Sequence, residues 1–272
     1  MKIKILGTAA AEGWPGLFCE CEACKVAEQL GGKDIRTRSS CLIDNKYMID
    51  FSADNYLHKL SYKLNMARIE HLFITHSHYD HFYPHDFEIR GEGFAHIENL
   101  KTLNVYGNEK VMARYNDAVG NMNIEKYVTY RYVRPFEYFQ AGNANVMPLK
   151  ANHDPNENCY IYTIEINDKK LLYGHDTGYF PEETWNEVLK HKFHGVILDC
   201  TFGHMVCRNG HMGISTCNEI KERLIENGCS NINTKFVITH FSHNINKTHD
   251  ELVKLGEKYG FTTAYDGIEI EI

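Results

Sequence analysis

Short apolar runs typical of strands alternate with amphipathic stretches typical of helices along the whole chain. The apolar runs predict strands at Lys2–Leu6, Ser40–Ile43, Tyr47–Asp50, Glu70–Thr75, Thr102–Tyr106, Val128–Tyr132, Ala144–Leu149, Tyr160–Ile166, Lys170–Tyr173, Gly195–Asp199, Lys235–Thr239 and Thr262–Ile270. The amphipathic stretches predict helices at Glu22–Leu30, Ala53–Lys63, Glu109–Ala118, Pro181–His191, Ser215–Asn227 and Thr248–Tyr259. No linker rich in Pro, Ser and Gly interrupts the alternation, so we expect one domain spanning residues 1–272.

Two pairs of predicted strands are joined by tight turns, at Asp44-Asn45-Lys46 and at Asn167-Asp168. Strands that are joined by so short a turn run antiparallel. The pattern therefore favours an α/β fold with mixed sheets over a purely parallel, doubly wound sheet.

Composition and charge exclude several classes of protein. Of the 272 residues 43% are hydrophobic and 24% charged, which is ordinary for a globular chain. The net charge of −7 lacks the basic footprint of a nucleic-acid-binding protein, which argues against a long nucleic acid as the partner. No apolar run reaches the length of a membrane span, so no membrane association is expected. The N-terminal segment Lys2-Ile3-Lys4-Ile5 alternates as a strand does, so we do not interpret it as a secretion signal.

The nine cysteines do not have the paired spacing of a disulfide framework, and we expect a cytoplasmic protein. Monomer and homodimer are both compatible with these features.

Potential metal ligands cluster directly after the predicted strand at Glu70–Thr75, in the segment His76-Ser77-His78-Tyr79-Asp80-His81. Imidazole and carboxylate groups are the ligands of zinc, manganese and iron, and a strand that ends in a loop can turn several side chains toward one point. A polar loop exposed to solvent is the alternative. The H-x-H-x-D-H spacing after an apolar strand favours the metal site.

A second candidate site lies in the N-terminal part, where Cys19-Glu20-Cys21-Glu22-Ala23-Cys24 places three thiols close together. Three thiols cannot all pair as disulfides, and in a reducing compartment they favour a structural zinc ion. Tetrahedral zinc needs a fourth ligand, for which we select His243, three residues after His240. Three incidental thiols are the alternative. We assign no role to the other six cysteines.

The histidine segment resembles the metallo-β-lactamase superfamily, and the resemblance extends over the whole chain. It implies a four-layer αββα sandwich with further metal ligands at later strand ends, which His153, Asp176 and His240 match. By this resemblance two divalent ions, zinc or manganese, share a hydroxide in the active site. One ion is bound by His76, His78 and His153, the other by Asp80, His81 and His240, and Asp176 bridges both.

The segment from Gly7 to Pro15 and the thiols that follow it narrow the resemblance. Together they are similar to the branch that contains the phosphoribosyl 1,2-cyclic phosphate phosphodiesterase of the carbon-phosphorus lyase pathway. The branch of pyrroloquinoline quinone synthesis shares these features but typically has a degenerate histidine motif. In this chain the motif is intact, which favours the phosphodiesterase branch.

His211 precedes a predicted helix, and in related phosphodiesterases a matching histidine contacts the scissile phosphate. We therefore expect His211 to be the general acid, with His204 as the second choice, and count Asp80 among the catalytic residues as well as the ligands. Asp199 is expected to accept a hydrogen bond from a metal-bound imidazole. His175 and His85 are expected to be structural or to face the substrate.

The function expected from these features is hydrolysis of a small cyclic or nucleotide-like phosphate ester. One alternative is a tRNA 3′-processing endonuclease, whose substrate-clamping arm would have to fit between His153 and Asp176, where only one predicted hairpin lies. The others are a thioester hydrolase, which would not need His211 or the thiols, and a cofactor-synthesis protein of the pyrroloquinoline quinone type.

Overall fold

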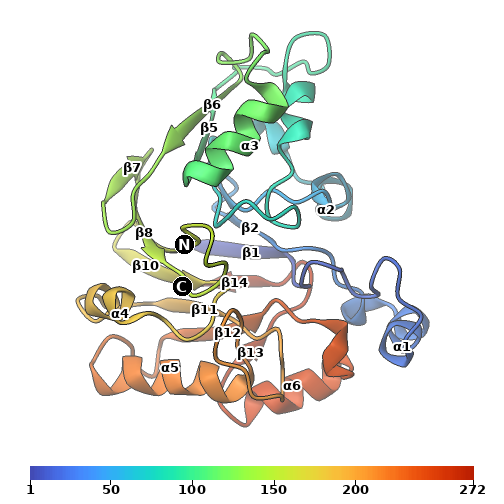
Figure 1. The fold of residues 1–272 in the computed structure, drawn as a ribbon, viewed down its shortest axis with the longest axis vertical. Helices are drawn as coiled ribbons and strands as arrows, with labels where there is room; N and C mark the ends of the chain where they lie inside the picture. The colour runs from blue at the N-terminus through green and yellow to red at the C-terminus, as the bar shows by residue number, and fades with distance from the viewer.

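The strands form two mixed sheets of seven strands each, packed face to face in a computed structural model that describes residues 1–272 (Figure 1). In sheet order, the first contains β14 (Glu269–Glu271), β1 (Lys2–Gly7), β2 (Ser40–Ile43), β3 (Tyr47–Ile49), β4 (His71–Phe73), β5 (Leu103–Gly107) and β6 (Val128–Tyr132). The second contains β13 (Thr262–Thr263), β12 (Lys235–Thr239), β11 (Gly195–Asp199), β10 (Lys169–Gly174), β9 (Tyr160–Ile166), β8 (Ala144–Lys150) and β7 (Phe139–Ala141).

Alternation along each strand sends apolar side chains to both faces of its sheet. In β4, Phe73 packs between the two sheets, whereas its neighbour Leu72 joins the core on the outer face. In β12, Val237 lies between the sheets and Ile238 lies on the outer face. Both faces of each sheet are therefore buried, which requires helices on the two outer sides.

Helices cover these outer faces. The first sheet carries α2 (Asn55–Tyr62) and α3 (Glu109–Val119), and the second carries α4 (Glu182–Val188), α5 (Ile214–Glu226) and α6 (His249–Glu257) (Figure 1). The helix α1 (Glu22–Leu30) packs its buried face into the same core as α5 and α6. Short 3₁₀ helices lie at Gly32–Asp34, Met66–Arg68, Pro84–Arg90 and His243–Ile245. The layers confirm the expected αββα sandwich with mixed sheets.

One expected strand is wrong, and one observed strand was not predicted. The segment Thr262–Ile270 is not one strand, because β13 pairs with β12 in the second sheet and β14 pairs with β1 in the first. Between them Gly267 has a φ of +90°, which a continuous strand does not allow. The strand β7, which pairs with β8 across a turn at Gly142, was not predicted.

The ends of strands from both sheets meet at one edge of the sandwich. β4 leads into His76, β8 into His153, β10 into Asp176 and β12 into His240, so four separate segments deliver polar side chains to the same place. The chain's helices all fall short of the combined length and apolarity that crossing a membrane requires.

Candidate metal centre

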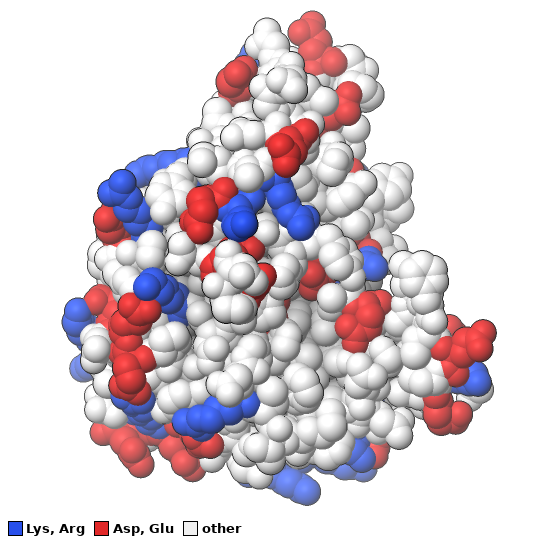
Figure 2. All heavy atoms as spheres, in the orientation of Figure 1, with Lys and Arg blue, Asp and Glu red and all other residues white.

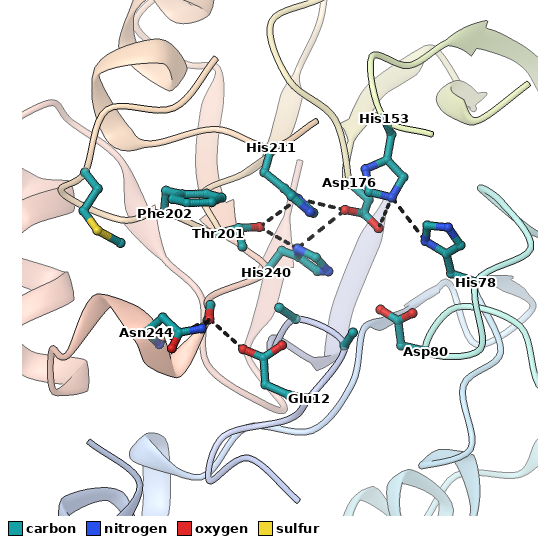
Figure 3. A pocket seen from close by; sticks show the side chains of 14 residues that line it. Glu12, His78, Asp80, His153, Asp176, Thr201, Phe202, His211, His240 and Asn244 are labelled. Carbon is teal, nitrogen blue, oxygen red and sulfur yellow. Dashed lines mark hydrogen bonds and ion pairs between the residues drawn. The ribbon is translucent and has the colours of Figure 1, made fainter. Parts of the chain in front are cut away.

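The predicted metal ligands converge at this edge in two overlapping groups. His76, His78 and His153 form one group with Asp176, and Asp80, His81 and His240 form the other with the same carboxylate. Within each group the potential donor atoms lie within 4.8 Å of one another. Asp176 lies between the imidazoles of the two groups, as Figure 3 shows for His153 and His240. This is the arrangement that a carboxylate shared by two metal ions requires.

The buried inner faces of the histidines have the chemistry of metal ligands. The Nε2 atoms of His76, His81 and His240 are buried and make no hydrogen bond. Yet Asp176 Oδ2 lies 3.2 Å from Nε2 of His76 and 2.9 Å from Nε2 of His81. Buried polar atoms that approach so closely without hydrogen-bond geometry are costly unless a cation joins them. The donor set therefore fits two divalent ions.

The opposite nitrogens of these rings are held from outside the centre. His81 Nδ1 lies 2.8 Å from Asp50, and His76 Nδ1 lies 3.0 Å from the hydroxyl of Thr75. His240 Nδ1 lies 2.7 Å from the hydroxyl of Thr201. Metal-binding histidines commonly use their second nitrogen in this way, which fixes the orientation of the ring.

The two remaining histidines follow the same rule. His153 Nδ1 lies 3.0 Å from the carbonyl oxygen of Gly210, and His78 Nε2 lies 3.4 Å from Asp154. Their free nitrogens, His153 Nε2 and His78 Nδ1, face each other at 3.2 Å. All five imidazoles thus present one nitrogen to the centre and anchor the other.

Backbone strain marks the same edge. Asp50, Asp176 and His240 have φ values of 60°, 55° and 65°, in the left-handed region that side-chain-bearing residues rarely adopt. Each follows or ends a strand that contributes to the centre. Such strain persists only where the surrounding structure enforces it, and it gathers at functional sites.

The local charges differ among the ligands. Burial lowers the pKa of His81, but the carboxylates of Asp80, Asp50 and Asp176 raise it well above its usual value, so a metal ion there would displace a proton. Burial lowers the pKa of His76 well below its usual value, so the ring is neutral, as a metal ligand must be. Burial alone would raise the pKa of Asp176, but the neighbouring imidazoles of His240 and His81 lower it far below its ordinary value. Asp176 is therefore an ionised carboxylate.

His211 lies beside Asp176 but is anchored differently from the ligands. Its Nδ1 is 2.9 Å from Asp199 and 3.0 Å from Asp176, and its side chain is 26% exposed. Burial lowers its pKa, but the charge of Asp199 and the hydrogen bond to Asp176 outweigh burial and raise the pKa to about 11. The backbone before α5 is tightly folded, since a Cβ at Gly213 would lie 1.8 Å from the carbonyl oxygen of Met205.

A pocket of about 350 Å³ opens above the centre. His78, Asp80, His153, Asp176, His211 and His240 line it on one side, together with Thr201. Its other walls come from residues 10–12, from Phe202 and Met205, and from Ser242 and Asn244 (Figure 3).

The thiol cluster lies next to this pocket. Cys19, Cys21 and Cys24 place their sulfur atoms within 4.8 Å of His243, and His243 Nδ1 lies 3.4 Å from Cys21 and 3.8 Å from Cys19. Partial burial opposes ionisation of Cys21, but hydrogen bonds from the Cys24 backbone and from neighbouring side chains lower its pKa to about 6. A group of thiols with an easily formed thiolate and one imidazole fits a zinc ion.

Comparison with known proteins identifies the family. A model of the beta-lactamase superfamily domain matches residues 45–241, more than half of the chain. The chain belongs to this superfamily. Among solved structures, a diphosphatase of the PhnP family has a TM-score of 0.78 at 22% identity, over 100% of this chain and 97% of that chain.

Two further structures share the superfamily fold. Zn²⁺-bound PqqB from Methylobacterium extorquens has a TM-score of 0.73 at 17% identity, over 100% of both chains. The short form of human tRNase Z has a TM-score of 0.67 at 15% identity, over 100% of this chain and 99% of that chain. No curated protein matches the sequence significantly. The superfamily fold implies a hydrolase with divalent metal ions, for which both groups of ligands are in place.

The structure brings together the ligands that the superfamily resemblance implies, and among the residues that hold these ligands from outside only Asp199 was expected. Asp199 lies 3.4 Å from His240 Nδ1, and the closer partner of that nitrogen is the hydroxyl of Thr201 at 2.7 Å. His204 and His85 are exposed, and the buried His175 lies 3.2 Å from the hydroxyl of Ser39. Sequence reasoning missed Asp50, although it ends a predicted strand, which is the signal that singled out the other residues.

Proposed function

We propose that this superfamily member is a metal-dependent phosphodiesterase that hydrolyses a small cyclic or nucleotide-like phosphate ester. The observation that carries the proposal is the position of His211. Its Nδ1 is fixed between two carboxylates, and its ring lines the pocket beside Asp176 (Figure 3). A histidine held in this way can donate a proton from Nε2 to a departing alkoxide oxygen.

In this proposal each part of the pocket has its own task. His76, His78 and His153 would hold one cation and Asp80, His81 and His240 the other, with Asp176 available to both. When bound, the two cations supply Lewis acidity toward the phosphate and lower the pKa of water. The residues around them orient the imidazoles, and His211 supplies the proton that the leaving oxygen needs.

The size and surroundings of the pocket support a small substrate. A volume of about 350 Å³ suits a nucleotide-sized ester rather than a folded RNA. Between His153 and Asp176 the chain contains only the β9–β10 hairpin and a short loop, with no clamping arm. On the face drawn in Figure 2, Lys and Arg side chains are mixed with Asp and Glu rather than gathered in one basic stripe.

The ligand types indicate which metal ions each site would bind, and the state of the cysteines bears on the cellular compartment. Imidazole and carboxylate ligands suit zinc or manganese in the dinuclear centre, whereas thiolates select zinc for the cysteine cluster. All nine cysteines are free, which agrees with a reducing cytoplasm.

The test uses bis-p-nitrophenyl phosphate and protein loaded with Mn²⁺ or Zn²⁺. We expect turnover by the wild type, none by Asp80→Ala, and a kcat about 10²–10⁴-fold lower for His211→Ala with unchanged metal content. His204→Ala is the matched control, because His204 is exposed on the same loop and does not line the pocket. Full activity of His211→Ala would refute the assignment of the acid.

If the fully loaded wild type hydrolyses no phosphodiester, the phosphodiesterase proposal itself fails. That result would favour a non-hydrolytic role in cofactor synthesis.

A further inference from the structure

Glu12 is the residue at which the thiol cluster and the substrate pocket meet. Its carboxylate lines the pocket, across from the histidines of the metal centre (Figure 3). The same carboxylate lies 3.5 Å from Nε2 of His243, whose Nδ1 faces the thiols. Binding or loss of a metal ion at the thiol cluster would therefore act on the pocket wall through His243 and Glu12.

The backbone around Glu12 is fixed by contacts with distant segments. The Ala10 N–H donates to the carbonyl oxygen of Phe241, at 3.1 Å, just before His243 in the chain. The Arg38 guanidinium donates to the carbonyl oxygen of Ala11 at 2.9 Å. The two residues that precede Glu12 in the pocket wall are therefore held in place.

The two carboxylate oxygens of Glu12 have different surroundings. Oε1 accepts a 2.6 Å hydrogen bond from the hydroxyl of Ser242 and is the oxygen that lies close to His243. Oε2 has no polar partner in the protein, and the side chain is 33% exposed. Oε1 thus contacts Ser242 and His243, whereas Oε2 is available to bind a ligand.

We propose that Glu12 is a substrate-specificity residue whose orientation is set by the metal ion of the thiol cluster. A histidine that binds a metal through one nitrogen commonly donates its other N–H to a carboxylate, and for His243 the Glu12 carboxylate, 3.5 Å from Nε2, is in position to accept. Its free Oε2 accepts a hydrogen bond from the substrate.

This inference rests on the proposed phosphodiesterase function and specifies its substrate further. The metal centre attracts the phosphate, whereas a carboxylate on the opposite wall repels anions and accepts hydrogen bonds. The ester should therefore carry a hydroxyl or amino group on the part that lies against residues 10–12. An ester without such a donor gains nothing from Glu12.

The first measurement compares two substrates in the metal-loaded Glu12→Gln variant. Bis-p-nitrophenyl phosphate has no donor, whereas the p-nitrophenyl ester of thymidine 5′-phosphate carries a sugar hydroxyl. Loss of the charge acts on both anionic esters, so the readout is their ratio: we expect KM for the thymidine ester to rise about 10-fold relative to KM for the donor-free ester, with little change in kcat. Equal effects on both esters would overturn the substrate contact.

The second measurement does not depend on activity. Cobalt(II) placed in the thiol cluster absorbs through its thiolate ligands, so its loss to a chelator can be followed by absorbance. We expect Glu12→Gln to lose this cobalt about 10-fold faster than the wild type, because His243 is no longer held by a carboxylate. An unchanged rate would overturn the link between Glu12 and the cluster.

Glu20→Gln is the matched control in both measurements. It removes the same charge between Cys19 and Cys21, but Glu20 is exposed and does not line the pocket. We expect it to leave both the substrate preference and the cobalt release unchanged. If the wild type cleaves neither ester, the proposed function fails, while cobalt release still tests the contact between Glu12 and His243.

Discussion

Replacing Asp50 with Asn tests whether residues outside the metal centre orient its ligands. Asp50 is fully buried, and its Oδ2 lies 2.8 Å from Nδ1 of His81. It also accepts hydrogen bonds from the backbone N–H of Thr75 at 2.8 Å and from the Thr75 hydroxyl at 2.9 Å. Asn has nearly the same shape and tolerates the φ of 60° at this position. The substitution therefore removes charge without imposing new backbone strain.

The expected loss is in metal affinity. Removing the outer partner of a metal-bound histidine costs about 10–100-fold in affinity, or roughly 1.4–2.7 kcal/mol. Asn keeps one oxygen for the N–H of Thr75, so we expect only a small change in melting temperature. Competition with a chelating dye would measure the affinity of the ion held by Asp80, His81 and His240.

Asp168→Asn is the control for this experiment. Asp168 also has a φ of 60°, but it is exposed in the turn between β9 and β10. We expect this variant to bind metal like the wild type. If Asp50→Asn also binds both ions as tightly as the wild type, Asp50 does not orient His81, and the reasoning fails.

Three other predictions concern the rest of the molecule. Cys21→Ser should lose one metal ion per chain and melt at a lower temperature, because metal binding contributes folding free energy, and elemental analysis showing unchanged metal would contradict this. Ile164→Ala, between the sheets, should lower the free energy of unfolding in urea by about 2–5 kcal/mol, and a loss well below that range would mean that the two sheets are loosely packed there. Burial lowers the pKa of His58, His71 and His249 to about 4, whereas an unfolded histidine titrates near 6.5. Their stabilising contribution is complete above pH about 6.5 and is lost as the pH falls toward about 4, so the urea midpoint should decrease over this range, and a flat midpoint would contradict it.

Local patterns predicted most of the elements. The helix at Glu22–Leu30 and the strands at Ser40–Ile43 and Gly195–Asp199 have the expected bounds, because apolar periodicity and turn residues lie within the segments themselves. The division of Thr262–Ile270 between two sheets depends on pairing with strands distant in sequence. The Asp266-Gly267 pair is a local signal for the break between the two strands, but the sheet that each strand joins has no local signal.

Some residues of the candidate site could be predicted from local sequence patterns, whereas others are brought there only by the fold. The spacing of His76, His78, Asp80 and His81 predicts a metal site from the sequence alone. The superfamily resemblance adds the ligands His153, Asp176 and His240. Asp50 and Thr201 hold His81 and His240 only because strands from different parts of the chain end side by side. Glu12 reaches the pocket for the same reason, through contacts of its loop with residues 241–243. Single polar residues of this kind have no pattern in the sequence that distinguishes them from surface residues.

The most direct test of the central claim is a metal titration of the apoprotein, with hydrolysis of bis-p-nitrophenyl phosphate measured at each addition. We predict that the thiol cluster binds about one ion and that activity reaches a plateau when about two further ions are bound. Protein with His76→Ala should bind fewer ions and show no such plateau. A wild-type protein that binds all of these ions and still cleaves no phosphodiester would contradict the account.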